Sequence, residues 1–321
     1  MTAIVGILNK RGIAIAADSA VTFPNADKKV TSNQRGEKVI ISQSKVINSG
    51  DKMLRLKDKQ PVAVMIVGCA LLRNLPWDVI IRWYRKKNDN SGFPTFQEYI
   101  HNFKDFIDSE IIPKYIEKDY SFEEVEITHL VFAGYGESEP YPSICKYAVT
   151  GINKGKLQWE SIEFVAISDK QESTIFKSGK FDIIDAIQFG IQKKRIAPIY
   201  KKVQVLIDDV LSQAMMFERY KSKIDYAAIR DEIKEIIDES GRNHFCHRLQ
   251  VIADYDLQKM ACLAENLIKA TELHRKLTFQ QEEVGGLVDL AVITKNDGFQ
   301  WLNRKSWYEP SKGGRYGKFG I

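Results

Sequence analysis

Two apolar runs joined by a polar turn open the sequence. Residues 2–8 are almost uniformly apolar, residues 9–12 have the composition of a turn, and Ile13–Ala17 is apolar again before Asp18. Short continuous apolar runs bounded by turn residues are typical of buried strands. The sequence therefore predicts a pair of buried strands at its start.

The rest of the first half combines short strands with two helices. Polar residues 23–37 are expected to form a loop, and Val62–Val67 a strongly apolar strand. The pattern becomes helical over 70–85, despite Pro76, and again over Phe96–Ile116. Further short β-like runs are expected at 38–42, 45–48 and 52–56.

In the second half a group of strands precedes a group of helices. Phe181–Gln192 is expected to be helical because its isoleucines fall on one face. Residues 198–239 have the pattern of two charged helices that end at Gly241, and Leu257–Lys276 has that of another helix. The expected strands are 129–133, 144–150, 162–167 and 174–176, and a closing hairpin over 287–294 and 299–303.

This order of elements predicts an α+β fold. Strands, two helices, strands, helices and a closing hairpin suggest two sheets covered by helices rather than a parallel βαβ sheet. We find no internal repeat and no low-complexity linker. We expect one domain over residues 1–305, with a helical extension at about 198–245, followed by a flexible basic tail at 306–321.

Composition and charge narrow the functional classes. The chain has 321 residues, 44% hydrophobic and 28% charged, as in an ordinary soluble globular protein. Its longest apolar run, Pro61–Leu72, is too short for a membrane helix, and no secretory leader is apparent. Most of the net charge of +5 lies in the last 21 residues, which argues against a broad nucleic-acid-binding face. The four dispersed cysteines favour the cytoplasm over a disulfide framework.

Two motifs that superficially suggest a cofactor are better explained by structural roles. The His244-Phe-Cys-His247 segment has no common zinc spacing, so we expect no metal site there. Gly134-Tyr-Gly136 lacks the third glycine and the helix of a dinucleotide-binding motif. The sequence therefore predicts no metal and no organic cofactor.

Thr2 is the first candidate for chemistry. It stands directly after Met1 and is small enough for removal of that residue to be expected. Thr2 would then carry a hydroxyl and a free α-amine, whose pKa near ~8 lets one residue supply both nucleophile and base. The structural alternative is that Thr2 merely permits removal of Met1.

The opening of the sequence resembles a known family. Thr2-Ala-Ile-Val-Gly-Ile-Leu followed by Ile13-Ala-Ile-Ala-Ala-Asp18-Ser19-Ala20-Val21-Thr22 resembles proteasome β-type subunits and related bacterial peptidase ring subunits. These are N-terminal-nucleophile (Ntn) hydrolases, and the resemblance implies a four-layer αββα sandwich. Weaker similarities follow at Asp51–Leu56, Val62–Ala70, Lys177–Lys180 and Val284–Gly286.

The resemblance also implies a role for each matched residue. Thr2 is the nucleophile, Lys52 keeps its amine neutral by like-charge repulsion, and Asp18 positions Lys52. The Gly68 N–H donates to the oxyanion, and Ser178 orients the α-amine. Substrate binding falls to the edge that carries Thr22 and Ala20, where an extended peptide would add as a strand.

Each of these residues has a simpler explanation. Asp18 and Gly68 are also common turn residues, Ser178 is also a helix N-cap, and Lys52 is one lysine among many. Lys38 and Lys45 precede apolar runs as well, so the choice of lysine stays open.

The sequence departs from the family near its end and after Ser19. Aligned on Gly285-Gly286, the family's serine position holds Val284 and its aspartate position holds Gln281, although Glu282 or Glu283 could substitute. Ala20 is short where many members have a longer basic side chain.

The sequence-based hypothesis is a threonine-dependent peptidase that forms a homo-oligomer and acts on peptides or proteins, with an ATP-dependent unfoldase as a candidate partner. A catalytically silent structural subunit and a small-molecule amidase on the same scaffold are the alternatives. The departures near Val284 favour the silent subunit.

Overall fold

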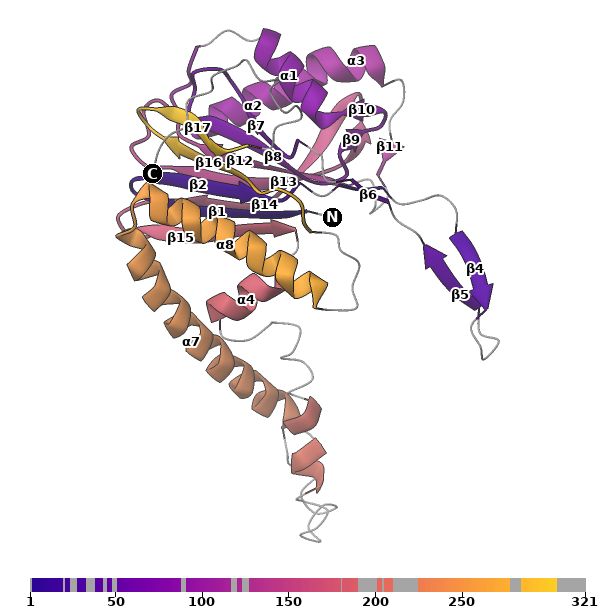
Figure 1. Ribbon diagram of the computed structural model, residues 1–321, viewed down its shortest axis with the longest axis vertical. Helices are drawn as coiled ribbons and strands as arrows, with labels where there is room; N and C mark the ends of the chain where they lie inside the picture. Colours follow the sequence, from indigo (N-terminus) through magenta and orange to yellow (C-terminus); the bar gives the residue numbers. More distant parts are fainter. Residues whose placement is uncertain are drawn as a thin grey trace, which may run out of the picture.

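The computed structural model defines an α+β chain with two main antiparallel sheets (Figure 1). The residues it describes are 2–19, 21–23, 28–32, 38–42, 45–47, 51–87, 91–116, 120–122, 127–179, 181–189, 201–203, 205–209, 225–277 and 284–304.

The first sheet has five strands in the order β15-β1-β2-β16-β17. Every residue of β1 and β2 is buried, as their uniformly apolar sequences predict for central strands. The closing hairpin joins the sheet through the pairing of β16 with β2. The strands are β1 (Ala3–Asn9), β2 (Gly12–Ala17), β15 (Ser173–Gly179), β16 (Asp289–Thr294) and β17 (Gly298–Asn303).

The second sheet has six strands, in the order β11-β13-β12-β8-β7 with β14 on the outer side of β13. Its central strands β8 and β12 are almost wholly buried. The strands are β7 (Met53–Arg55), β8 (Val62–Gly68), β11 (Tyr120–Ser121), β12 (Thr128–Gly134), β13 (Ser143–Asn153) and β14 (Lys156–Ala166).

Three two-stranded ladders lie outside the main sheets. The prediction of a loop over 23–37 was wrong in part, because β4 (Lys28–Ser32) pairs with β5 (Lys38–Ser42) in a hairpin that stands away from the sheets in Figure 1. Strand β4 is polar and lacks the apolar signal on which the sequence pattern depends, whereas its partner β5 lies at the β-like run expected over 38–42. The other two ladders pair β3 (Val21–Phe23) with β6 (Lys45–Ile47), and β9 (Leu71–Leu72) with β10 (Leu75–Pro76).

Helices cover the outer face of each main sheet (Figure 1). Helix α2 begins at a capping box in which Thr95 and Glu98 satisfy each other's backbone N–H groups, and it continues through a π-helical turn into α3. The helices are α1 (Trp77–Lys87), α2 (Phe96–Phe106), η1 (Ile107–Ile111), α3 (Ile112–Tyr115), α4 (Asp182–Phe189), α7 (Tyr226–Ala253) and α8 (Leu257–Lys276).

Two expected helix boundaries were wrong. Helix α1 begins at Trp77 rather than at residue 70, because Pro76 disfavours helical geometry in the residue before it and the β9–β10 hairpin occupies that stretch. Helix α7 continues through Gly241 to Ala253, since a glycine inside a long helix costs only about 1 kcal/mol. Gly241 is therefore not a helix stop, and the domain boundaries stay predictions.

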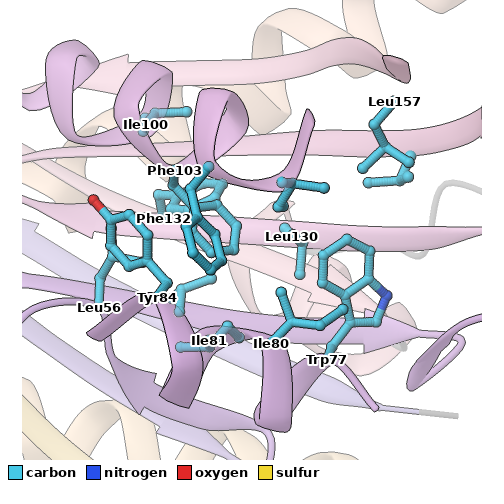
Figure 2. Packing of buried hydrophobic residues seen from close by; sticks show 14 of the residues in the cluster. Leu56, Trp77, Ile80, Ile81, Tyr84, Ile100, Phe103, Leu130, Phe132 and Leu157 are labelled. Atoms are coloured by element: carbon cyan, nitrogen blue, oxygen red, sulfur yellow. The ribbon is translucent and has the colours of Figure 1, made fainter. Parts of the chain in front are cut away.

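Three apolar clusters hold these elements together. One packs α1 and α2 against the six-stranded sheet, with Trp77, Tyr84 and Phe103 at its centre (Figure 2). A second lies between the two sheets, and a third packs α8 against the far face of the five-stranded sheet. The space between the sheets is thus apolar along most of its length, which makes the polar residues at its ends conspicuous.

None of the helices in the described ranges is long and apolar enough to cross a bilayer. The basic tail expected at 306–321 lies outside the described residues.

Candidate functional site

The candidate site lies where β1 begins. Thr2 is 5% exposed and immediately precedes β1. The backbone N–H of Ala3 donates to Asp18 Oδ1 at 2.8 Å, and the N–H of Asp18 donates to the Ala3 carbonyl at 3.2 Å. Asp18 follows the last residue of β2, so the β1–β2 ladder brings it beside the first peptide bonds of β1. The start of this strand is therefore held in place from its first residues.

Lys52 forms a buried ion pair with Asp18. Its Nζ lies 2.8 Å from Asp18 Oδ1, and the two side chains are 6% and 0% exposed. The same carboxylate oxygen accepts the Ala3 N–H, so the ammonium lies within two hydrogen-bond lengths of the peptide bond that Thr2 makes. Lys38 and Lys45, the other lysines considered, lie in β5 and β6.

The backbone of Lys52 is fixed by the six-stranded sheet. Its carbonyl accepts the N–H of Ile66 at 2.8 Å, just before β7 pairs with β8. The ion pair therefore links the two sheets: Asp18 comes from the end of β2 and Lys52 from the start of β7. A buried pair of charges is expensive to desolvate and is stabilised only by further hydrogen bonds.

The segment before β16 supplies some of those bonds. The N–H of Gly285 donates to Asp18 Oδ2 at 3.4 Å, and the Gly285 carbonyl accepts from the Ser19 N–H at 3.2 Å. The Ser19 hydroxyl donates to the Leu287 carbonyl. Residues 285–287 are thus bound to Asp18 and Ser19, and the carboxylate of Asp18 is contacted on both oxygens.

Ser178 lies on the neighbouring strand with an unused hydroxyl. Ser178 pairs with Ile4 in the β1–β15 ladder and is 1% exposed. It is not the N-cap of α4, because that helix begins only at Asp182. Its Oγ has no hydrogen-bond partner within the described part of the chain. A buried hydroxyl without a partner is uncommon and indicates a place where another polar group binds.

Gly179 permits the close approach of β15 to Thr2. Its φ is +89°, and a Cβ built there would lie 1.8 Å from the Thr2 carbonyl oxygen. No side chain fits at that distance, so glycine is required by both conformation and space. The Ser178–Gly179 pair thus brings the end of β15 against Thr2.

Gly68 ends β8 at the same end of the sheets. Counting along β8, it lies two residues beyond Ile66, whose N–H binds Lys52. Its φ is +89°, a Cβ would lie 2.7 Å from the Ile127 carbonyl, and the residue is exposed. The strand therefore turns at Gly68 and leaves its backbone accessible.

Several other positions considered in the sequence have no described polar contact with this site. Val284 stands next to Gly285, but its side chain packs in the apolar cluster against α8 and offers no hydroxyl. Thr22 pairs with Val46 in the β3–β6 ladder, but its side chain lies outside what is described. Also outside are the positions Ala20, Gln281, Glu282 and Glu283, and the side chains of 244–247.

Two residues near the site were missed by the sequence analysis. Asp289 is 2% exposed and pairs with Ala17, the residue before Asp18. His129 pairs with Val67, the residue before Gly68, and is half-buried. The sequence signal that could have identified them is a titratable side chain near the start of an otherwise apolar strand: Asp289 is the first residue of β16 and His129 the second residue of β12.

The titration of His129 is perturbed by its surroundings. Burial lowers the pKa of its imidazole, and the positive charge of Lys146 lowers that pKa further. The neutral imidazole is therefore favoured at neutral pH.

Comparisons with known proteins give little beyond this geometry. No protein-family model and no curated protein matches the sequence. Among solved structures, an Anbu (Gly-1) mutant from Hyphomicrobium sp. strain MC1 aligns at 12% identity with a TM-score of 0.43, over 95% of this chain and 86% of its own. Similarity this low transfers no function, so the interpretation rests on the contacts described above.

Proposed function

We propose that this chain is an Ntn hydrolase with the four-layer αββα sandwich of that class, in which Thr2 becomes the terminal residue and cleaves amide bonds. The observation that carries the proposal is the shared carboxylate oxygen of Asp18, which binds both the Ala3 N–H and the Lys52 ammonium. Burying the charge of a lysine beside the first peptide bond of a strand costs desolvation free energy. Buried ionisable groups with a specific charged partner cluster at functional sites.

In the proposed reaction the Thr2 hydroxyl oxygen attacks the amide carbonyl carbon, and its proton passes to the α-amine of the same residue. Collapse of the tetrahedral intermediate breaks the carbon–nitrogen bond, and the α-amine returns the proton to the leaving nitrogen. A water molecule, deprotonated by the amine, then hydrolyses the ester and restores the hydroxyl. One residue thus serves as nucleophile and as general base.

The surrounding residues have distinct roles in this scheme. The positive charge of Lys52 disfavours protonation of the α-amine, which keeps the base neutral, and Asp18 holds Lys52 in position. The unpartnered Ser178 hydroxyl is suited to accept a hydrogen bond from the amine. The accessible backbone of Gly68 is suited to stabilise the oxyanion, a contact typically worth about 3 kcal/mol of barrier.

The proposal extends to the setting of the enzyme. We propose peptides or proteins as substrates, bound as an added strand near Thr22, and a cytoplasmic homo-oligomer supplied by an ATP-dependent unfoldase. Strand addition gives affinity through the backbone with little demand on sequence. Light scattering of the purified protein tests the homo-oligomer directly: a monomer contradicts it.

A second candidate function is a catalytically silent subunit of the same fold. The observation that favours it is Val284, which is packed among apolar side chains at the position where the family's active members carry a serine. Without that hydroxyl the α-amine has one fewer hydrogen-bonding partner.

A peptide epoxyketone separates the two candidates, because its stable adduct needs a hydroxyl and a free amine on one residue. Intact-mass and peptide mass spectrometry should find Thr2 as the first residue, and the adduct on Thr2. The Thr2→Ser variant should still be labelled, and Thr2→Ala should lose both labelling and peptide hydrolysis while keeping its circular-dichroism spectrum. A terminal Thr2 that is not labelled supports the silent subunit, and an internal Thr2 in the folded protein contradicts the hydrolase.

A further inference from the structure

The face of the six-stranded sheet that carries His129 is set by its neighbours. Thr128 accepts a hydrogen bond at 2.9 Å from the Trp77 indole N–H and so points to the helices. Successive side chains of a strand point to opposite faces. His129 therefore points into the space between the two sheets, as Val131 does from the apolar cluster there.

His129 lies against Gly68. The imidazole Nδ1 is 3.8 Å from the position that a Cβ of Gly68 would occupy. Whereas Val131 on the same face is fully buried, His129 is half-buried, so solvent enters between the sheets at this end. A group bound at the Gly68 backbone would thus meet the imidazole.

Lys146 points into the same space from the next strand. It pairs with Val131 of β12, and directly opposite residues of antiparallel strands share a face. Two residues earlier on β13, the Ile144 side chain lies 3.0 Å from a Cβ built at Gly6 of the facing sheet. Lys146 lies two residues nearer the site than Ile144 on β13, and Ile4 lies two residues nearer the site than Gly6 on β1. Lys146 is therefore expected to face the level of Ile4 and of Ser178, which pairs with Ile4.

The charge of Lys146 is only loosely compensated. It is half-buried and forms no ion pair within 4.0 Å and no side-chain hydrogen bond with another described residue. Glu163 pairs with it on β14 and is exposed, and its charge opposes the lowering of the Lys146 pKa by burial. Lys177 on the facing β15 lies within electrostatic range of Glu163 but is itself paired with Asp185. Among the described residues, the other charged groups on the inner face at this end are the Asp18–Lys52 pair and Asp289, which lies opposite the inward-facing Ala17.

We propose that His129 and Lys146 form a substrate subsite that binds a carboxylate on the residue next to the scissile bond. The inference rests on the proposed function, which places the reacting carbonyl at Gly68. The Lys146 ammonium supplies the charge, and the neutral imidazole supplies a directed hydrogen bond. A half-desolvated cation with no close counter-ion among the described residues gains most from an incoming anion, because the attraction between the two charges strengthens as water is excluded.

Two fluorogenic peptides that differ only in a terminal glutamate or glutamine, each with an aminocoumarin leaving group, test this subsite. The wild type should prefer the glutamate peptide by about tenfold or more in kcat/KM, the range expected for one charge contact. Lys146→Met should bring the ratio close to one, mainly through KM, and Lys146→Glu should invert it. Lys170→Met, at an exposed lysine outside this face, is the matched control and should keep the wild-type ratio.

The pH profile isolates the contribution of His129. Because the pKa of His129 is lowered, its positive charge appears only below the ordinary histidine range near ~6.5. The preference for glutamate should therefore stay constant from pH 8 down to that range and rise only below it. His129→Gln keeps a hydrogen-bonding side chain and should abolish that rise while leaving the preference at pH 8.

The outcomes distinguish the two hypotheses. If the epoxyketone labels Thr2 but Lys146→Met keeps the wild-type ratio, the subsite is wrong and the hydrolase stands. If Thr2 is not labelled, the hydrolase is wrong. In that case fluorescence anisotropy of the labelled glutamate and glutamine peptides still tests the subsite: equal affinity for wild type and Lys146→Met overturns it.

Discussion

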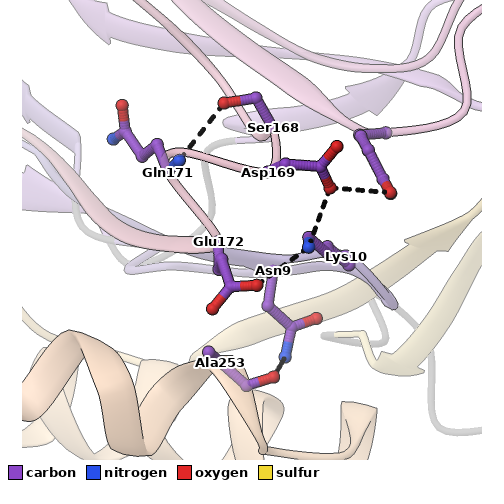
Figure 3. Close-up of polar contacts among 8 residues, drawn as sticks. Asn9, Lys10, Ser168, Asp169, Gln171, Glu172 and Ala253 are labelled. Carbon is purple, nitrogen blue, oxygen red and sulfur yellow. Dashed lines mark hydrogen bonds and ion pairs between the residues drawn. The ribbon is translucent and has the colours of Figure 1, made fainter.

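The two ends of β1 carry the same type of ion pair in opposite environments. At its start, Lys52 and Asp18 meet at 2.8 Å with almost no exposure of either side chain. At its end, Lys10 meets Asp169 at 3.0 Å and Glu172 at 2.8 Å, with Lys10 one-third exposed and both acids mostly exposed (Figure 3). The nitrogen–oxygen distances of the two sets of ion pairs are nearly equal, but only the pairs of Lys10 are accessible to water.

The two ends also differ in which contacts stabilise them. The exposed end is stabilised chiefly by Asn9, whose buried amide donates to the carbonyls of Ile252 at 3.0 Å and Tyr255 at 2.8 Å. Figure 3 shows the same amide beside Ala253, at the end of α7. There the ion pairs are accessory and the amide anchors a helix. At the start of β1 the buried pair has a large desolvation cost, and the proposed function explains that cost by the need for a positive charge beside Thr2.

The largest effect is expected from Lys52→Met. Removing the ammonium leaves Asp18 buried without its cation, and breaking such a pair typically costs about 3–5 kcal/mol of unfolding free energy. Hydrolysis should be lost as well. Urea denaturation and peptide turnover measure the two effects.

The double variant Asp18→Asn with Lys52→Met sharpens this result. An asparagine oxygen still accepts the Ala3 N–H, so the double variant should regain much of the stability and remain inactive. Recovery of activity together with stability would show that the pair is purely structural.

A smaller effect is expected from Asn9→Ala, and on stability alone. The carbonyls of Ile252 and Tyr255 lose a buried donor, which typically costs about 1–3 kcal/mol. Thermal denaturation measures the loss, and turnover by the folded variant should match the wild type. Asn9→Asp should be worse than alanine, since it places a carboxylate against the same carbonyls. An equally stable Asn9→Asp would contradict the assigned contacts.

The smallest effect is expected from Lys10→Met, the exposed counterpart of Lys52→Met. Glu172 and, to a smaller extent, Asp169 raise the pKa of Lys10 through hydrogen bonds, but all three groups are solvated. Melting temperature and turnover should both stay at the wild-type values across pH 6 to about 9, below the range in which a lysine titrates. A marked loss would remove the contrast between the two ends of the strand.

Local pattern was sufficient for much of the fold. Helix 257–276 was expected with the limits it has, and the opening strands and the helical run 96–116 were placed within a few residues. These elements have strong apolar periodicity, and α8 also begins at the Asp256 cap. The polar strand β4 has no such signal and was missed, although its partner β5 was expected at residues 38–42.

The site was only partly accessible from sequence. The candidates Thr2, Asp18 and Lys52 came from a resemblance, and their meeting depends on pairings between distant strands that periodicity does not encode. Their catalytic roles stay predictions. His129 was missed because one imidazole in an apolar strand has the pattern of a core residue, and its relation to Gly68 appears only once β12 pairs with β8.

The burial of Thr2 has a consequence for the order of events during biosynthesis. Strand β15, which closes over it, lies at residues 173–179, so at about 5–20 residues per second the ribosome needs roughly ten seconds or more to supply this neighbour. Throughout that interval Thr2 lacks this neighbour, and afterwards it is buried. We therefore expect the proposed removal of Met1 to take place while the nascent chain is still emerging.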